Sequence, residues 1–284
     1  MQSVRGFEYG VIHCRPDQDI ELTCFINNHL EGASLSAEEL LEFGSVYVNQ
    51  KRVTQNQSIT SLDHIRIHRK PRRFHTHQTN WQERIVYEND NLIILNKPSG
   101  IPCHATVDNI KENLLHILET HTGKKYYITH RLDIPTQGLL ILAKDQRTQT
   151  QINKAFADRK IKKIYKAHCV PNEISLGFHE HHMIKSPRAP KTMRDEKGEN
   201  TEICQLIILQ TNKFTKHHEH RIELCTGRTH QIRAQMAHIG SPLIGDTLYQ
   251  GPAWDNENAI ALWSYELEFL ENDFISETKI FLQP

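Results

Sequence analysis

The sequence predicts an α+β protein with a mixed, largely antiparallel central sheet flanked by helices and loops, plus a small N-terminal α/β module. Most β-type runs after residue 81 follow one another without an intervening helix, which disfavours a doubly wound parallel sheet. The 284 residues, 38% of them hydrophobic, suffice for one large or two ordinary cores. A basic, proline-containing stretch divides the chain into a module at 1–70, a linker at 71–80 and a larger domain at 81–284.

The module is predicted to contain two helices followed by short strands. Apolar side chains recur at helical spacing in the first helix: Leu22, Phe25, Ile26 and Leu30. Ser36 is expected to cap a second helix over 37–43, which Gly44 ends. Alternation with period two predicts strands at 45–49 and 65–68.

The larger domain is predicted to be richer in strands than in helices. Apolar runs and alternation predict strands at 92–95, 126–129, 139–143, 163–170, 202–209, 221–225, 260–269 and 279–282. Helical spacing predicts helices at 113–121, around 152–159 and from about 229.

The formal net charge is zero, but the charges are segregated along the chain. Residues 124–166 carry eleven basic and three acidic residues, a net +8, whereas residues 1–64 carry −5 and residues 253–284 carry −6. A basic segment between acidic ends is typical of a local polyanion site. Interleaved opposite charges on the folded surface would give the same totals, so composition leaves both interpretations open.

The sequence disfavours a membrane protein, a secreted protein and a protein with a CxxC metal or redox motif. No apolar run approaches the ~18 residues of a membrane span, and the first ten residues contain no apolar signal-peptide core. The six cysteines are never closer than ten residues, so no CxxC motif is present. We therefore expect reduced thiols in a cytoplasmic protein that does not bind membranes.

Two segments have the residue types of an active site. Asp133 lies in the loop 129–138 beside an arginine, where a carboxylate is expected to stay ionised and to act as a nucleophile or electrostatic stabiliser. A loop aspartate more often forms a turn or cap. The segment 225–233 is a glycine-led turn into a helix, which forms an anion site by geometry and could aim Arg233 into a cleft. A surface helix with solvated arginines is the equal alternative.

Two further features allow RNA or metal binding. Basic residues surround Tyr165 within 160–166, and such residues track phosphates while an aromatic ring stacks on an unpaired base. A half-buried strand tyrosine is the commoner case. The histidine-rich segments 179–182 and 217–220 do not match HExxH, and no cysteine stands at zinc-finger spacing. We expect no metal site.

Four stretches resemble, in this order and at these separations, the RluA-class RNA pseudouridine synthases: NDNLIILNKPSGIPCHAT (89–106), HRLDIPTQGLLILAKD (130–145), KIYKAHCV (163–170) and GRTHQIRAQMAHIGSPLIGDTLY (227–249). The resemblance covers 81–284 and implies the catalytic domain of that family. It implies isomerisation of uridine to pseudouridine in ribosomal RNA, with the large subunit favoured, or in tRNA. It further implies RNA as the partner of a monomer that needs no cofactor and no metal.

The resemblance also implies roles for single residues. Asp133 is the aspartate of the HRLD motif, which is the essential catalytic residue, and Arg131 before it helps to displace and flip the target base. Tyr165 stacks on the uracil and is implicated in removing the proton from carbon 5, and Arg233 pairs with the aspartate. Further RNA contacts are expected from Lys97, His130, Lys163, Arg228, Thr229 and His230.

Two features depart from the family pattern. Gln137 stands where HRLDxxTSG has Ser, which affects loop contacts more than activity. The module resembles the RNA-binding module named after ribosomal protein S four through GSVYVNQKRV (44–53), but its helix at 37–43 is acidic where that module is basic. We therefore expect a degenerate module that binds RNA less strongly or contacts something else.

Three alternative functions remain open. A catalytically silent RNA-binding homologue is disfavoured by the intact Asp133, Tyr165 and Arg233. A metal-dependent hydrolase lacks the ligand spacing. A glycosidase usually needs a second carboxylate, and none is apparent near Asp133. The sequence does not separate a covalent nucleophile from elimination to a glycal.

Overall fold

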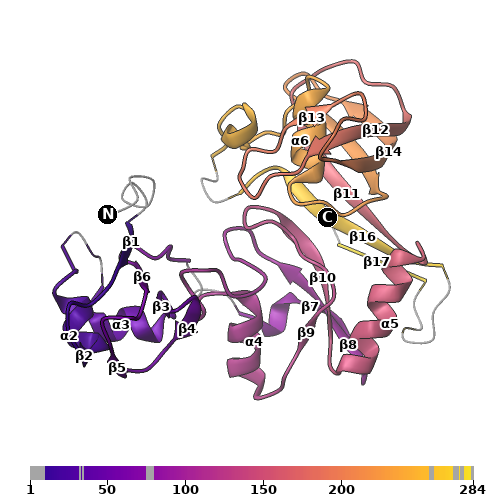
Figure 1. The fold of residues 1–284 in the computed structure, drawn as a ribbon. Coiled ribbons are helices and arrows are strands. Elements are labelled where there is room, and N and C mark those ends of the chain that lie inside the picture. The colour runs from indigo at the N-terminus through magenta and orange to yellow at the C-terminus, as the bar shows by residue number, and fades with distance from the viewer. Residues whose placement is uncertain are drawn as a thin grey trace. The chain divides into compact units, whose positions relative to one another are not determined.

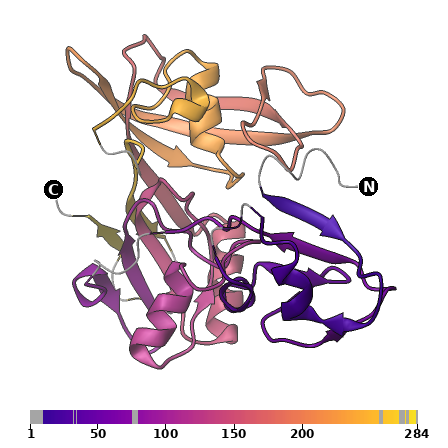
Figure 2. The same cartoon turned by 90° about the vertical axis from the view of Figure 1, so that its left-hand side faces the viewer.

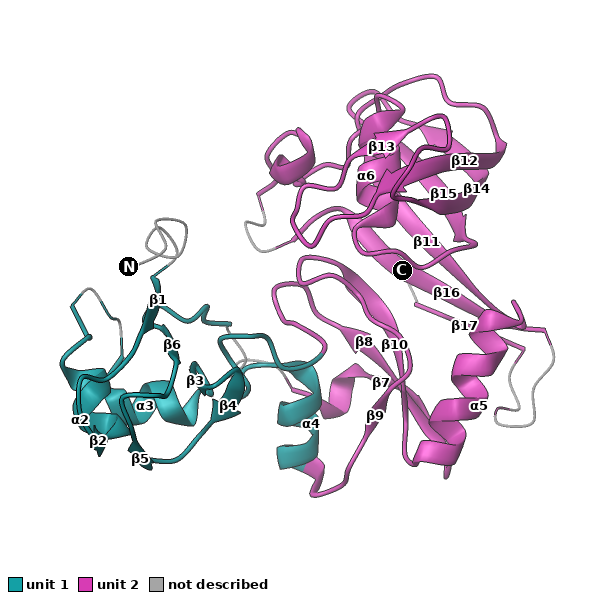
Figure 3. Cartoon of the chain, viewed as in Figure 1, with its two compact units in different colours: residues 1–77, 104–121 teal, residues 78–103, 122–284 magenta. Residues whose placement is uncertain are grey.

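The computed structural model describes most of the chain: residues 10–31, 33, 35–74, 80–255, 259–270, 275 and 278–282. Residues 1–9 of the predicted module and 75–79 of the predicted linker lie outside the described residues. No helix of the described part is long and apolar enough to cross a membrane. The chain forms two compact units: residues 1–77 with 104–121 make unit 1, and residues 78–103 with 122–284 make unit 2 (Figure 3).

Unit 1 contains a four-stranded antiparallel sheet and short helices (Figure 1). The strand order is β1 (Val11–Cys14), β6 (Ile65–His68), β3 (Val46–Val48) and β4 (Lys51–Val53). The remaining elements are a strand pair and three helices: β2 (Ile20–Glu21) with β5 (Ser58–Ile59), then α2 (Leu22–Asn27), α3 (Ala37–Glu42) and α4 (Leu114–Thr122), of which the last residue belongs to unit 2.

Local sequence explains the ends of these elements. The Ser36 hydroxyl accepts the Glu39 N–H and the Glu39 carboxylate accepts the Ser36 N–H, so the predicted cap is a complete capping box. Asn49 and Gln50 join β3 to β4 with φ of 50° and 69°, the pair of left-handed residues that a tight hairpin turn needs. The helix predicted at 37–43 and the strand predicted at 45–49 are confirmed with ends shifted by one residue, and the strand predicted at 65–68 is confirmed with the same ends.

Basic residues at the end of the module hold the segment that contributes α4. The Arg72 guanidinium donates to both carboxylate oxygens of Asp108, at 2.7 Å and 3.0 Å for the shortest contact to each. Arg73 does the same to Glu112, at 2.7 Å and 3.1 Å. The sequence assigned residues 104–121 to the larger domain, whereas the contacts group them with unit 1. These two arginines of the predicted basic linker therefore have internal partners.

The Arg72–Asp108 pair makes the stability of unit 1 depend on pH. Burial opposes the Asp108 charge, but the hydrogen bonds from Arg72 and Thr106 lower the pKa of Asp108 to about 2. A carboxyl whose folded pKa is lowered stabilises the fold above its unfolded value of ~4 and loses this contribution as the pH falls towards 2. We expect Asp108→Asn to cost about 1–2 kcal/mol of unfolding free energy at pH 7, and the difference from wild type to shrink below pH 4. Urea unfolding of the full chain at several pH values tests this, with exposed Asp19→Asn as control; a difference that does not vary with pH would contradict it.

Unit 2 is built on one large sheet. Its strand order is β13 (Met193–Arg194), β12 (Gly177–Ile184), β14 (Thr201–Lys213), β15 (His218–Leu224), β11 (Ile161–Cys169), β16 (Leu262–Phe269), β10 (Gln137–Ala143), β8 (Leu92–Lys97) and β7 (Ile85–Glu88). Two short strands lie off this path: β17 (Lys279–Phe281) pairs with β16, and β9 (Tyr127–Ile128) pairs with β10. Every pairing in this sheet is antiparallel except β10 with β16. The predicted mixed, largely antiparallel sheet is confirmed.

Helices and one glycine shape the region around the site. α5 (Gln146–Ala157) packs on β10 and β11, and α6 (Gln231–His238), the orange helix of Figure 2, lies against β13 and β14. The short helices η1 (Gln82–Arg84) and η2 (Thr247–Tyr249) complete the unit. Gly138 has a φ of +114°, and a Cβ there would lie 2.3 Å from the Ser264 carbonyl oxygen. Only glycine therefore lets β10 pass so close to β16 directly after the loop that carries Asp133.

Candidate active site

Asp133 lies on a short loop between β9 and β10. Its carbonyl accepts the Thr136 N–H at 3.1 Å, which closes a turn around the proline. The buried Cys103 thiol lies 3.3 Å from both the carbonyl and the N–H of Leu132, the residue before the aspartate. The Asp133 side chain is 22% exposed. The loop is thus fixed by backbone contacts while its carboxylate remains accessible.

Lys97 holds the same loop from its other side. The residue is fully buried, and its Nζ donates to the carbonyls of Pro98, Ile101 and Ile134 at 2.9, 2.8 and 3.2 Å. Burial lowers the pKa of Lys97 to about 8, so at neutral pH the ammonium keeps three hydrogens for three acceptors. The predicted RNA contact of Lys97 is corrected accordingly, because the ammonium is covered by backbone and has no surface for a phosphate.

We expect Lys97→Met to weaken both the fold and the reaction. Three buried carbonyls lose their donor, which costs about 2–4 kcal/mol of unfolding free energy, and a looser loop lowers turnover about tenfold. Thermal denaturation and initial rates measure the two effects. Lys154→Met is the control, because that side chain is 75% exposed and forms a surface ion pair with Asp158. A Lys97→Met protein as stable and active as the control would refute this role.

Arg233 on α6 connects two aspartates. Its Nε and Nη2 donate to the two Asp246 oxygens at 2.7 and 2.9 Å, and its Nη1 donates to Asp133 Oδ2 at 3.2 Å. Arg233 is 4% exposed and Asp246 is 1% exposed. Burial opposes the guanidinium charge, but hydrogen bonding to Asp246 and the charges of both carboxylates outweigh it and raise the pKa of Arg233. The Asp246 carboxylate therefore fixes the Arg233 guanidinium, which stays positively charged and faces the Asp133 carboxylate.

Asp246 and Tyr249 are site residues that the sequence reasoning did not single out. Both lie in GDTLY, at the end of the fourth stretch, with Asp246 before η2 and Tyr249 at its end. The Arg233 Cζ lies 5.2 Å from the centre of the Tyr249 ring. A buried arginine needs a buried partner, so an acidic residue in the same stretch was a signal that could have been used.

His230 reaches Asp133 from the residue before α6. It adopts a left-handed conformation with φ +59°. Its Nδ1 lies 3.1 Å from the Tyr249 hydroxyl and its Nε2 lies 3.9 Å from Asp133 Oδ2. Burial, assisted by Arg233, lowers the pKa of His230 in spite of the opposing effect of Asp133. The ring is therefore neutral at physiological pH.

Tyr165 lies on β11 and is 4% exposed. Burial raises its pKa, and the Asp133 carboxylate raises it further. The phenol therefore keeps its proton, and its hydroxyl is not suited to accepting another one. Stacking of the Tyr165 ring on a base stays a prediction.

The other predicted RNA contacts differ in exposure. Arg131, Arg228 and Thr229 are exposed, and Arg228 forms an ion pair with Glu202 at 3.3 Å. Lys163 is half-buried, with its ammonium 4.9 Å from the centre of the Phe156 ring. The exposure of Arg131, Arg228 and Thr229 permits the RNA contacts predicted for them. The half-buried position of Lys163 leaves less of its side chain accessible to RNA.

His130 is used by the loop backbone. Its Nε2 accepts the Ile141 N–H at 3.1 Å. Burial, assisted by the Lys163 charge, lowers the pKa of His130 to about 3, so the ring is neutral. A neutral ring that already accepts a backbone N–H is poorly suited to binding a phosphate, and an RNA contact of His130 stays a prediction.

The histidines of β12 contribute to one group with metal-ligand chemistry. Within the described part of the chain, the ligand atoms of His181, Asp195 and His238 lie within 4.8 Å of one another. Gln235 Nε2 donates to His181 Nδ1 at 2.9 Å and to the Cys204 carbonyl at 3.1 Å. His181 Nδ1 is therefore already occupied by a protein donor. We therefore assign no ligand to this group.

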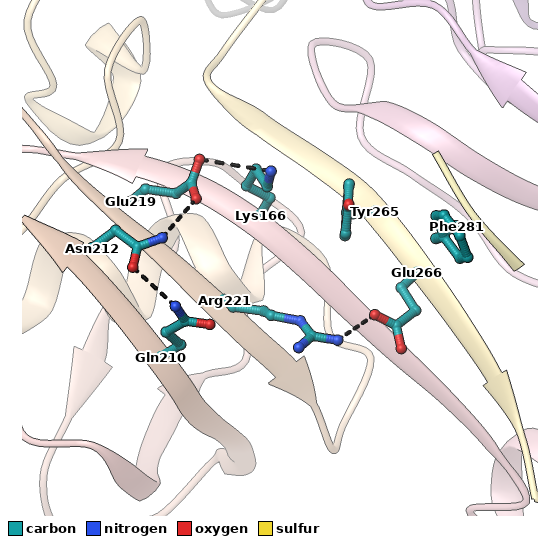
Figure 4. A pocket seen from close by; sticks show the side chains of 8 residues that line it. All are labelled: Lys166, Gln210, Asn212, Glu219, Arg221, Tyr265, Glu266 and Phe281. Carbon is teal, nitrogen blue, oxygen red and sulfur yellow. Dashed lines mark hydrogen bonds and ion pairs between the residues drawn. The ribbon is translucent and has the colours of Figure 1, made fainter. Parts of the chain in front are cut away.

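A pocket of about 280 Å³ opens on the other face of the sheet (Figure 4). Lys166 lines it and directly follows Tyr165 on β11, and consecutive strand residues point to opposite faces. Its charged side chains pair with one another, Lys166 with Glu219 at 3.7 Å and Arg221 with Glu266. The pocket is therefore not part of the site around Asp133. The other lining residues are Gln210, Asn212, Tyr265 and Phe281.

Comparison with known proteins identifies the fold and the family. The solved structure of Human RNA Pseudouridylate Synthase Domain Containing 4 superposes with a TM-score of 0.58 at 20% identity, covering 72% of this chain and 89% of that one. The architecture is thus the pseudouridine synthase fold. The family model described as RNA pseudouridylate synthase matches residues 91–238, just over half of the chain. The chain belongs to the RNA pseudouridylate synthase family.

Similar curated proteins are named as a chloroplastic enzyme, a ribosomal large subunit enzyme and a tRNA enzyme. RNA pseudouridine synthase 6, chloroplastic, of Arabidopsis thaliana is 29% identical over 227 residues, which cover 71% of this chain and 48% of the relative. Ribosomal large subunit pseudouridine synthase D of Buchnera aphidicola is 32% identical, with coverages of 70% and 66%. tRNA pseudouridine(31) synthase of Saccharomyces cerevisiae is 27% identical, with coverages of 69% and 56%. The chain spans about half the length of the plant relative.

Proposed function

We propose that the protein is an RNA pseudouridine synthase in which Asp133 is the essential carboxylate. The observation that carries this proposal is the ion pair of an accessible Asp133 with a buried Arg233, in a chain of the RNA pseudouridylate synthase family. The pair joins two of the stretches that the family resemblance rests on, which lie one hundred residues apart in sequence.

The reaction is a redox-neutral rearrangement. The bond between ribose C1′ and uracil N1 breaks, the base turns, and a bond between C1′ and C5 forms. The C5 proton leaves and N1 gains a proton. No step requires an electron acceptor or an activated phosphate, so the side chains of this chain suffice.

Asp133 acts at ribose C1′, and Arg233 orients its carboxylate. The carboxylate either forms a covalent bond to C1′ or assists elimination to a glycal. A guanidinium fixed by Asp246 cannot turn towards solvent, so Asp133 meets a donor at a constant position. The Tyr165 ring would pack against the uracil.

RNA contact is assigned to the exposed residues of the site. Arg131 lies two residues before Asp133 and would take the space of the displaced base, while Arg228 and Thr229 would contact the backbone. Extruding a uridine costs a few kcal/mol, and least in a loop or bulge. We therefore place the target in unpaired or distorted RNA.

Large-subunit ribosomal RNA is the substrate that we propose, with tRNA as the other outcome. Support comes from relatives such as the Buchnera aphidicola protein, which is named as a ribosomal large subunit pseudouridine synthase, whereas the yeast relative is named as a tRNA enzyme. We also propose that the protein is located in the cytoplasm.

Tritium release tests the activity directly. RNA labelled with [5-³H]uridine and prepared from cells that lack the gene is incubated with the purified full chain. Release of tritium to water that depends on the enzyme is the expected result. Binding of the same RNA without any release would instead indicate the catalytically silent homologue.

A further inference from the structure

A chain of polar contacts runs from the backbone at Lys191 to Asp133. The Lys191 N–H donates to the Tyr249 hydroxyl at 2.7 Å. The same hydroxyl lies 3.1 Å from His230 Nδ1. On the other side of the ring, His230 Nε2 lies 3.9 Å from Asp133 Oδ2. All four residues belong to unit 2.

The Lys191 N–H is a donor of fixed direction, and it favours one placement of the protons along these contacts. The Lys191 N–H occupies one lone pair of the Tyr249 oxygen. Burial raises the pKa of Tyr249, so the hydroxyl keeps its proton and needs an acceptor. His230 Nδ1 is the acceptor within hydrogen-bonding distance. A neutral imidazole that accepts at Nδ1 carries its hydrogen at Nε2, the nitrogen that faces the carboxylate.

We propose that Tyr249 is a positioning residue whose hydroxyl holds His230 in the Nε2–H form, so that a neutral N–H is aimed at Asp133. This inference rests on the proposed function, in which Asp133 reacts at C1′. Arg233 Nη1 and His230 Nε2 both address Oδ2 of the aspartate. Oδ1 is then the oxygen that faces the ribose. The proposal requires this distance of 3.9 Å to shorten to a hydrogen bond in the complex with substrate, as catalytic contacts commonly do.

A neutral donor suits this position because the surroundings are already charged. The groups that face His230 are Asp133, Asp246, Arg233 and Lys191. A second full positive charge beside Arg233 would be repelled and would weaken the carboxylate as a nucleophile. The Nε2–H of a neutral His230 ring orients Asp133 Oδ2 without adding this second positive charge.

Tyr249→Phe isolates the hydroxyl. The aromatic ring stays beside the Arg233 guanidinium, with 5.2 Å between the Arg233 Cζ and the ring centre in the wild type. The hydroxyl is lost with both of its contacts, as donor to His230 Nδ1 and as acceptor of the Lys191 N–H. Without that donor the imidazole is freer to take up a proton at Nδ1, which raises its pKa. We expect about a tenfold loss of kcat on [5-³H]uridine-labelled RNA, with KM unchanged within about twofold. The acid limb of the rate profile should move to higher pH.

Tyr87→Phe is the matched control. That hydroxyl accepts a hydrogen bond from Asn89 Nδ2 at 3.2 Å on β7 of the same unit, and its ring contributes to the core. The control should leave kcat, KM and the acid limb unchanged. A Tyr249→Phe protein with a wild-type pH profile and rate would overturn the proposal, because a purely structural hydroxyl would not move the acid limb.

Nitrogen-15 NMR of the histidines in the full chain tests the tautomer without activity. The wild type should show His230 protonated at Nε2, and Tyr249→Phe should show a mixture of forms. A wild-type His230 protonated at Nδ1 would overturn the inference even if the enzyme is active. An enzyme that releases no tritium from any RNA, with His230 protonated at Nε2, would reject the proposed function and the positioning role while leaving the tautomer established.

Discussion

Asp133→Asn should abolish pseudouridine formation while leaving the fold intact. The amide has no negative charge to offer C1′ and cannot form the covalent bond or assist elimination, so turnover should fall by at least about 10³-fold. Asp133 accepts only one of the three hydrogen bonds that Arg233 makes to the two aspartates. Arg233 therefore stays in place, and the melting temperature should change by only a few degrees.

The measurement combines activity with binding. Tritium release gives the turnover, and filter binding of the same labelled RNA shows whether the interface survives. Asp158→Asn is the control, because that carboxylate is on the surface and pairs with Lys154 one helical turn away. Turnover by Asp133→Asn close to that of the control would exclude Asp133 as the essential carboxylate.

Arg233→Ala should have the largest effect on stability and also remove activity. It leaves the Asp246 carboxylate buried without its partner, which costs about 3–5 kcal/mol of unfolding free energy. Asp133 loses its fixed donor at the same time, so turnover should fall at least about 100-fold. Urea unfolding and tritium release measure the two losses on one preparation.

A double substitution separates these two losses. Arg233→Met with Asp246→Leu removes the whole buried pair, so stability should recover part of what Arg233→Ala loses. Turnover should remain low in the double variant because Asp133 still lacks its donor. Recovery of both stability and turnover would show that Arg233 serves the fold alone.

The sequence led to the centre of the site through short motifs. Asp133 and Arg233 were both marked by the resemblance, and the ion pair between them is present at 3.2 Å. The largely antiparallel sheet followed from strands that succeed one another without helices. These features are local in sequence, or are carried by stretches long enough to be recognised.

The remaining site features depend on burial that the sequence does not display. The resemblance placed Lys97 among the RNA contacts, and only the fold reveals that this lysine is buried with three carbonyls around its ammonium. Asp246 became a site residue because α6 brings Arg233 next to it. β12 was missed because its histidine-rich sequence lacks the apolar alternation of a strand.

The N-terminal arginines illustrate the same limit. The sequence predicted a basic linker that contains Arg72 and Arg73, and it gave no partner for either side chain. Arg72 and Arg73 instead pair with Asp108 and Glu112, which lie about 36 to 39 residues further along the chain. Charge patterns along a sequence do not show which opposite charges meet after folding.

Mapping of pseudouridines in total RNA tests the central claim most directly. RNA is compared between the parent strain, a strain that lacks the gene, and that strain carrying either the wild-type chain or Asp133→Asn. We expect at least one pseudouridine, in large-subunit ribosomal RNA, to be absent from the deletion strain and restored by the wild-type chain but not by the variant. An unchanged map in the deletion strain, or restoration by Asp133→Asn, would contradict the assignment.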